Sequence, residues 1–468
     1  MKKNDIIEVT IEDMSSEGLG IGHAMGMAVF VKDTVPGDRV LAGIVKMKKT
    51  YAFARLEEIL APGKDRVEPV CPVARKCGGC QIQEMSYPAQ LKLKERKVRE
   101  NLQRIGGLNP DEGVFLPILG MENPWHYRNK AQFPIGRDKA GNLIAGFYAG
   151  RTHSIIDYHR CEIGIDENKP VLEAVLSWMK EYRIAPYDEK DGSGVIRHVC
   201  TRAGFSTQDL MVVIVAAASK LKEEQALVRR LQEASGRFRL RSVVLNSNLE
   251  KTNVILGRKN RVLYGEDYIE DRIGPLTYRI SAGSFYQVNP VQTEALYRTA
   301  LEFAALTGKE TVWDLYCGTG TISLFLAQRA ERVIGIEVVA EAVEKAKENA
   351  RLNQIDNCEF ITGKAEDLAG SLPDADVIVV DPPRKGLDRI VTDTILRVRP
   401  ERVVYVSCDS ATLARDLALF TAGGYELRKI QPVDQFCHSV HVESCVLLER
   451  VSNRKADSYS RKSMIMTR

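Results

Sequence analysis

A cysteine near the carboxyl end of the chain stands where nucleophilic chemistry is often performed. Cys408 follows directly on the apolar run 403–406, and a helix-forming stretch begins after it. A strand that ends on a cysteine and turns into a helix puts the thiol at the carboxyl edge of a sheet, where open α/β sheets bind ligands. A helix N-terminus beside the sulfur lowers the thiol pKa, and the thiolate is the nucleophilic form. The sequence therefore predicts a reactive Cys408, against the commoner alternative of a buried packing cysteine.

A glycine-rich turn earlier in the chain predicts a cofactor site at the same edge. Residues 312–321 have the pattern of a strand, a turn with Gly318 and Gly320, and a helix start. Glycines let the backbone approach a ligand closely, and the helix N-terminus supplies free N–H groups. Glu337 ends the next expected strand, where a carboxylate can bind ribose hydroxyls. Ser323 replaces the third glycine of a dinucleotide fold, and the turn instead resembles the S-adenosylmethionine loop of class I methyltransferases.

An aspartate followed by two prolines comes after the expected strand 376–380 and predicts an acidic group in the cleft. The prolines fix the backbone and direct Asp381 toward the active site. Arg384 stands where enzymes that methylate exocyclic amines carry an aromatic residue, which disfavours that chemistry. Cytosine-5 methyltransferases of DNA carry their nucleophilic cysteine in this loop, whereas here the thiol lies one strand later, at Cys408.

Glu443, directly before the last expected strand, is the candidate proton acceptor that acts with Cys408. Carbon 5 of uracil is not nucleophilic, but addition of a thiolate to carbon 6 gives an enolate that takes a methyl group from a sulfonium. A base must then remove the carbon-5 proton so that elimination frees the enzyme. The alternative for Glu443 is an ordinary surface carboxylate.

Three clustered cysteines predict a metal centre in an earlier part of the chain. Cys71, Cys77 and Cys80 have C-x5-C-x2-C spacing, and Cys161 is a candidate fourth ligand. Ten cysteines in a chain of this length favour metal binding or catalysis over disulfides if the compartment is reducing. Zinc and iron–sulfur clusters both accept four thiolates, so these residues alone leave the metal open.

The elements that must position these residues fall into three parts of a multidomain α/β protein. Residues 1–60 alternate short strands with turn signals and predict a small, OB-like β-barrel. Residues 61–280 form a central α+β region that carries the cysteines, and residues 281–450 alternate strands with helices, which predicts a doubly wound, Rossmann-like domain. In this last part the expected strands are 312–316, 332–336, 359–361, 376–380 and 402–406, with a helix at 340–352 and a hairpin of 425–430 and 444–449.

Composition and charge narrow the class of protein. Hydrophobic residues make up 44% and charged residues 27% of the chain, as in ordinary globular proteins. The longest apolar run, 211–218, is too short to cross a membrane, and the first residues do not form a signal peptide, which predicts a cytoplasmic protein. A basic tail, 451–468, carries the net charge of +4 and is expected to be disordered, and a second basic stretch lies at 92–104. Both suit a phosphate backbone, against the alternative of solvated faces.

Five ordered motifs carry a resemblance to a known family. They are residues 285–290, 314–320, 381–384, 407–416 and 441–443. Over nearly its whole length the chain resembles the RNA (uracil-5-)-methyltransferase family, in the 23S rRNA branch that has an N-terminal TRAM barrel and an iron–sulfur cluster. The resemblance implies that Cys408 is the nucleophile and Glu443 the general base.

The same resemblance implies the bound groups. S-adenosyl-L-methionine would be bound by Gln287, Tyr316, Glu337 and Asp381. Gln287 and Asp381 also stand where they could contact the uracil edge. A [4Fe–4S] cluster, with a structural or RNA-binding role because methyl transfer needs no redox step, would be held by Cys71, Cys77, Cys80 and Cys161. Thr321 stands where some relatives have asparagine, which makes it a doubtful ligand.

The expected function is methylation of uracil carbon 5 in 23S ribosomal RNA, by a monomer that takes the target base out of its stack. The first alternative is a uracil in a tRNA loop. The others are a non-catalytic iron–sulfur RNA-binding protein and a methyltransferase with another acceptor, which the intact Cys408, Glu443 and Asp381 and the position of the thiol disfavour.

Overall fold

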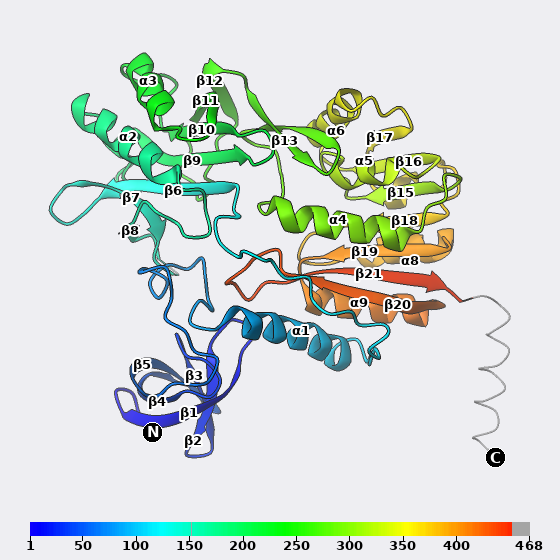
Figure 1. Ribbon diagram of the computed structural model, residues 1–468, viewed down its shortest axis with the longest axis horizontal. Helices are drawn as coiled ribbons and strands as arrows, with labels where there is room; N and C mark the ends of the chain where they lie inside the picture. Colours follow the sequence, from blue (N-terminus) through cyan, green and yellow to red (C-terminus); the bar gives the residue numbers. More distant parts are fainter. Residues whose placement is uncertain (151, 452–468) are drawn as a thin grey trace.

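The computed structural model describes residues 1–150 and 152–451, and its first element is a closed β-barrel (Figure 1). Its strands follow one another around the barrel in the order β1-β2-β3-β5-β4. The side chains of Val29, Val31, Ala52 and Ala54 alternate inward and fill the core. This confirms the predicted barrel. The strands are β1 (Ile6–Met14), β2 (Gly20–Ala24), β3 (Met27–Val31), β4 (Arg39–Met47) and β5 (Tyr51–Ala61).

A seven-stranded sheet in the order β12-β11-β10-β9-β6-β7-β8 forms the central part of the chain. Helices α2 and α3 cover one of its faces, and the hairpin of β13 and β14 packs on the other. Because both faces are covered, β9 and β10 are buried along their whole length. The elements are β6 (Lys130–Arg137), β7 (Leu143–Tyr148), β8 (Ile155–Asp157), α2 (Asn168–Glu181), β9 (Ile196–Gly204), β10 (Asp209–Ala216), α3 (Glu224–Ala234), β11 (Arg239–Ser247), β12 (Lys259–Gly265), β13 (Tyr268–Ile273) and β14 (Leu276–Ser281).

The carboxyl-terminal part is a second seven-stranded sheet, in the order β17-β16-β15-β18-β19-β21-β20. Strands β15 to β19 run parallel, and β21 lies antiparallel between β19 and β20, so the predicted hairpin is present. Helices cover both faces of this sheet, as the strand–helix alternation predicted. The elements are α4 (Pro290–Ala304), β15 (Thr311–Leu315), α5 (Thr321–Ala327), β16 (Arg332–Glu337), α6 (Ala340–Leu352), β17 (Cys358–Thr362), α7 (Ala365–Leu368), β18 (Val377–Val380), α8 (Arg389–Val398), β19 (Arg402–Ser407), α9 (Ser410–Ala422), β20 (Tyr425–Val433) and β21 (Glu443–Arg450).

Helix α1 (Tyr87–Arg104) joins the amino-terminal part to this second sheet, because it packs against α9 (Figure 1). Val98 and Leu102 enter the apolar core beneath the sheet, and the Asn101 side chain donates a hydrogen bond of 2.8 Å to the Ser410 hydroxyl. The segment that follows runs beside β20 and pairs with it through parallel bridges at Phe115 and Leu119.

The basic stretch predicted at 92–104 is therefore only partly a solvent-facing stripe. Lys94 is buried, and the Lys97 amine donates inward to the Val440 carbonyl. The basic tail predicted at 451–468 lies outside the described residues from position 452 onward. Across residues 1–150 and 152–451, no helix combines the length and apolar character that crossing a membrane requires.

Candidate active site

The parallel strands of the second sheet bring the predicted site residues to one edge. Tyr316, Asp381 and Cys408 directly follow β15, β18 and β19, and Glu337 is the last residue of β16. Because these strands are parallel, their carboxyl ends meet at the same side of the sheet. Glu443 reaches this edge from the opposite direction, since it opens the antiparallel strand β21.

Cys408 and Glu443 lie opposite each other at this edge. Ser407 pairs with Ser444, and Cys408 and Glu443 are the next residues along the two strands. Glu443 is only 3% exposed. Burial raises the pKa of its carboxyl to about 8, the charge of Asp381 raises it further, and Arg384 opposes this rise. This environment therefore favours the protonated form of Glu443 at neutral pH.

The predicted lowering of the Cys408 pKa is wrong for the ligand-free protein. Burial raises the pKa of this thiol to about 11, and the charges of Glu443 and Asp381 act in the same direction. The α9 N-terminus does not offset this effect, because the Asp409 carboxylate caps it and accepts hydrogen bonds from the Ala411 and Thr412 N–H groups at 2.9 and 3.0 Å. A cation bound beside the thiol would lower its pKa again.

Asp381 is the second acidic group of the site. Burial raises the pKa of its carboxyl to about 7. Within the described part of the chain, no donor is hydrogen-bonded to its side-chain oxygens, and its N–H donates to the Leu315 carbonyl at 3.4 Å. Asp381 is partly buried, and a desolvated carboxylate without donors is costly unless a ligand supplies them.

One side of the glycine turn, residues 316–320, faces open space. Tyr316, Gly318 and Gly320 have φ values of +66°, +55° and +79°. A Cβ built on Gly318 would meet nothing within 4 Å, so this side of the loop is free for a ligand. The Gly318 N–H donates to the Glu337 carboxylate at 3.2 Å, which fixes that acid against the loop. Positive φ at a non-glycine residue such as Tyr316 is the kind of strain that clusters at functional sites.

Asp314 is a site residue that the sequence analysis placed in the motif but did not select. It is fully buried, accepts a hydrogen bond from the Ser323 hydroxyl through Oδ2, and leaves Oδ1 without a partner. Burial raises the pKa of this carboxyl to about 7. Acidic groups with unsatisfied oxygens beside an open glycine turn fit a cationic nucleoside such as S-adenosylmethionine.

Gln287 lies in the loop that leads into α4 and is tied to the central sheet. The Asn129 side chain donates to the Gln287 carbonyl at 3.0 Å, and the Asn129 N–H donates to the Val288 carbonyl at 2.9 Å. In the same loop the ring of Phe285 is 74% exposed. The loop therefore connects the central part of the chain with the helix that packs on β19 and β21.

The loop of residues 434–442 leads directly to Glu443 and is held by a buried ion pair. Lys94 of α1 is 1% exposed, and its amine contacts the Asp434 carboxylate. The same amine donates to the Phe436 carbonyl at 2.9 Å. A fully desolvated pair with additional hydrogen bonds of this kind fixes geometry strongly.

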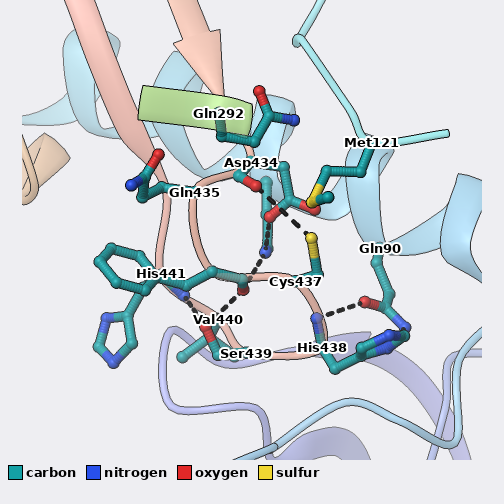
Figure 2. Close-up of polar contacts among 12 residues, drawn as sticks. Gln90, Met121, Gln292, Asp434, Gln435, Cys437, His438, Ser439, Val440 and His441 are labelled. Atoms are coloured by element: carbon teal, nitrogen blue, oxygen red, sulfur yellow. Dashed lines mark hydrogen bonds and ion pairs between the residues drawn. The ribbon is translucent and has the colours of Figure 1, made fainter. Parts of the chain in front are cut away.

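The 434–442 loop is also joined to α1, as Figure 2 shows for His438 and Gln90, and to the segment 71–82 that carries three of the cysteines. The His438 N–H donates to the Gln90 side chain at 3.1 Å, and the His438 carbonyl accepts from the Gln81 and Ile82 N–H groups at 3.0 and 3.2 Å. The ring of His438 stacks on Trp125 with 3.8 Å between centroids. No motif in the sequence indicated this connection, because its partners are far apart along the chain.

The four predicted metal ligands are free thiols that lie near one another. Cys71, Cys77, Cys80 and Cys161 are all partly buried. Burial raises the pKa of Cys80 to about 12, and the other three thiols raise it further by their charge. The Gly79 N–H donates to the Cys77 sulfur at 3.4 Å, a bond typical of thiolate ligands.

The chemistry of these four donors fits a four-thiolate centre. In the described part of the chain, however, no three histidine, cysteine, aspartate or glutamate side chains are close enough to hold a metal ion as they stand. Binding would therefore require the thiols to draw together. Cys437 packs in the same apolar cluster as Cys80 and Cys161. Cys200, Cys317 and Cys445 are buried in a different part of the core.

Comparisons with known proteins find matches over nearly the whole chain. A family model described as tRNA (Uracil-5-)-methyltransferase matches residues 86–451, and a TRAM domain model matches residues 2–56. An uncharacterized RNA methyltransferase of Halalkalibacterium halodurans is 49% identical over 453 residues, covering 96% of this chain and 98% of its own. One of Listeria monocytogenes serotype 4b is 47% identical over 455 residues, with the same coverage of 96% and 98%.

One solved structure is similar over nearly the whole chain. It is the crystal structure of Pyrococcus abyssi tRNA (uracil-54, C5)-methyltransferase in complex with S-adenosyl-L-homocysteine. Its TM-score is 0.78 at 26% sequence identity, and the match covers 94% of this chain and 100% of that one.

Proposed function

The chain belongs to the tRNA (uracil-5-)-methyltransferase family, and from this premise we propose how its own residues methylate uracil carbon 5 in RNA. The observation that carries the proposal is the placement of Cys408 and Glu443 opposite each other, at the edge where Asp381 and the glycine turn also lie. A nucleophile and a base on the same side of a ligand cleft are what addition and elimination on a uracil ring require.

In the proposed reaction the Cys408 sulfur adds to carbon 6 of the uracil, and the displaced ring electron pair forms the bond from carbon 5 to the methyl group. S-adenosylmethionine supplies the methyl group as a sulfonium. The Glu443 carboxylate then takes the proton from carbon 5, and the carbon 6–sulfur bond breaks to restore the thiolate. The charges of Asp381 and Glu443 raise the Cys408 pKa in the ligand-free protein. A cation bound beside these acids offsets their charge and favours both the thiolate of Cys408 and the carboxylate of Glu443.

The proposed binding residues are assigned from their positions at or near the carboxyl edge of the second sheet. Gln287, Tyr316, Glu337 and Asp381 bind the cofactor, and Gln287 and Asp381 also contact the uracil edge. The unpartnered Asp381 carboxyl supports this assignment, because it is free to accept from a ring N–H. A protonated Asp381, which its raised pKa allows, can instead donate to a ring carbonyl.

Cys71, Cys77, Cys80 and Cys161 are proposed to hold a [4Fe–4S] cluster in the central domain, residues 61–280. The barrel, residues 1–60, and the methyltransferase domain, residues 281–450, complete the proposed organisation. Iron and sulfide in protein purified anaerobically would support the cluster, and stoichiometric zinc alone would refute it. The connection between Ile82 and His438 gives such a cluster a structural role in holding the loop before Glu443.

The proposed substrate is 23S ribosomal RNA. The presence of both a barrel and a cysteine segment supports it, since the resemblance to the ribosomal branch rests on these two parts. A tRNA uracil is the second candidate, because the similar solved structure is that of a tRNA (uracil-54, C5)-methyltransferase.

The deciding experiment is methyl transfer from labelled S-adenosylmethionine to unmodified 23S rRNA and, separately, to unmodified tRNA. Digested products are mapped as 5-methyluridine. Label in 23S rRNA alone supports the first substrate, and label in tRNA alone replaces it with the second. Absence of label in both would refute the proposed substrates.

A further inference from the structure

A buried arginine and a partly buried lysine of the central sheet have no counter-charge among the described residues. Lys130 and Arg202 are directly paired across the antiparallel strands β6 and β9. Arg202 is 4% exposed, and its guanidinium donates to the Ser284 carbonyl. In residues 1–150 and 152–451, no acidic side chain forms an ion pair with Lys130, Arg202 or the neighbouring Arg128.

The groups around Lys130 disfavour its charged form and leave the cation uncompensated. Burial lowers the pKa of its amine to about 8, and the charges of Arg202 and Arg128 act in the same direction. The one acidic group that faces the pair is Cys200, and burial raises its thiol pKa to about 11, so it is neutral at pH 7. Desolvated cations without a partner are costly, and a site that binds an anion recovers the cost when the ligand arrives.

These cations border the loop that carries Gln287. Asn129, between Arg128 and Lys130, donates to the carbonyls of Gln287 and Val288. Arg202 reaches the same loop through Ser284. An anion bound by Lys130 and Arg202 is thus held next to the segment that includes the exposed ring of Phe285.

The same face of the sheet continues into a cavity without acidic residues. Further along the pairing of β6 with β9, Gln132 is opposite Cys200 and Pro134 is opposite His198. Because alternate residues of a strand point to the same face, these side chains share a face with Lys130 and Arg202. Gln132, Pro134 and His198 line a cavity of about 200 Å³, which Cys77 of the proposed cluster also borders, together with Tyr148, Phe147 and the Gly78–Gly79 backbone. The buried Nδ1 of His198 has no hydrogen-bond partner. Aromatic rings are groups that receive an unstacked base, so the cations and the cavity together suit a nucleic-acid strand better than an isolated anion.

We propose that Lys130 and Arg202 bind a backbone phosphate of the RNA strand that flanks the target uracil. The inference rests on the proposed function in one respect, namely that the ligand of the adjacent loop is RNA. Arg202 fixes the Phe285–Gln287 loop and contributes charge, and the Lys130 amine makes the direct contact. The site sets the position of the strand without reading its sequence.

The test measures binding of a fluorescein-labelled oligouridylate to the full-length protein over a range of salt concentrations. For Lys130→Gln we expect about tenfold weaker binding at low salt. We also expect a log–log salt slope that is smaller by about 0.7, the value for one phosphate contact on a single strand. Lys130→Arg keeps the charge and should bind as wild type. Lys139→Gln is the matched control, since Lys139 is exposed in the turn that follows the same strand.

Binding of S-adenosylhomocysteine, measured by calorimetry on the same proteins, separates the two sources of an anion. Unchanged cofactor affinity with a reduced salt slope supports the phosphate site. An unchanged salt slope in Lys130→Gln overturns the proposed phosphate site. A loss of affinity for the cofactor alone also overturns it, because Lys130 would then bind the carboxylate of the cofactor.

A covalent adduct between wild-type protein and 5-fluorouracil RNA reports on the proposed function by itself. If wild type forms the adduct while Lys130→Gln keeps the wild-type slope, the phosphate site alone is refuted. If wild type binds RNA with the expected slope change in Lys130→Gln but forms no adduct, the proposed chemistry is refuted and the phosphate site stands.

Discussion

Cys408 and Glu443 are opposite each other across the antiparallel pair β19–β21, one step beyond the Ser407–Ser444 pair. They come from the end of one strand and the start of another, so neither can shift along the edge without breaking the ladder. In the proposed reaction the thiol attacks carbon 6 of the uracil and the carboxylate takes the proton from carbon 5. Separate predictions follow for the two residues, because they act in different steps.

Removal of the thiol should abolish the covalent step. RNA with 5-fluorouracil cannot lose its carbon-5 substituent, so wild-type protein with S-adenosylmethionine should form an adduct that survives denaturing electrophoresis. Cys408→Ala should form none, and its methyl transfer should fall by about 10³-fold or more. Cys358→Ala is the control, since Cys358 is also partly buried but packs behind the cofactor loop. An adduct in Cys408→Ala would show that another group is the nucleophile.

Removal of the base should leave the adduct but prevent its release. Glu443→Gln keeps the shape of the side chain and removes its capacity to accept the carbon-5 proton, so turnover should fall by about 10²–10⁴-fold. With ordinary uracil RNA, this variant should accumulate a methylated protein–RNA adduct that wild type does not show. The measurement is denaturing electrophoresis of a single-turnover reaction with labelled cofactor. Normal turnover in Glu443→Gln would assign proton removal to another residue.

The buried acids should make the ligand-free protein less stable as pH rises. Glu443 has a pKa of about 8 against an ordinary value of 4.5, and Asp314 and Asp381 have pKa values of about 7 against 3.8. The folded state thus binds these protons more tightly than the unfolded state, and their stabilising contribution is present at low pH and lost as pH rises through 7 to 8.

Urea denaturation at pH 6 and pH 8.5 tests this dependence. One pKa unit corresponds to about 1.4 kcal/mol, so the expected loss for wild type is roughly a few kcal/mol. Glu443→Gln removes one of the three titrations and should show a smaller loss. An equal loss in variant and wild type would mean that Glu443 is already ionised in the folded protein at pH 6.

Much of the fold could be predicted because its signals are local. The apolar runs that end at Tyr316, Val380 and Val406 mark strands that the structure contains at nearly the same bounds, and 340–352 is a helix with the predicted ends. The convergence of Cys408, Asp381 and Glu337 at one edge follows from the parallel order alone. A strand–helix pattern therefore suffices to predict which residues share a site.

The electrostatics of the site could not be predicted, because they depend on partners from distant strands. The thiol pKa was expected to be low on the strength of the following helix. It is raised because Glu443 and Asp381 face Cys408, and because Asp409 caps the helix that was expected to act on it. The inward orientation of Lys94 could not be predicted from the sequence either, because its partner Asp434 lies 340 residues further along the chain.

The Lys94–Asp434 pair should be among the most sensitive contacts in the molecule. Both side chains are buried, and Asp434 also accepts a hydrogen bond of 2.7 Å from the Tyr87 hydroxyl. Lys94→Met would leave the Asp434 carboxylate desolvated and without its cation, which typically costs about 3–5 kcal/mol. Urea denaturation measures the loss, and Lys92→Met is the matched control because Lys92 is exposed on the same helix.

A second variant separates the charge of this pair from its packing. Lys94→Met combined with Asp434→Leu removes both charges and should recover much of the stability, since an apolar pair of similar volume often replaces a buried ion pair without loss. If the loop before Glu443 depends on the pair for its position, the double variant should be stable and yet accumulate the methylated adduct, as Glu443→Gln does. A single variant Lys94→Met as stable as Lys92→Met would show that Asp434 takes up a proton or another partner, and that Lys94 does not fix the loop.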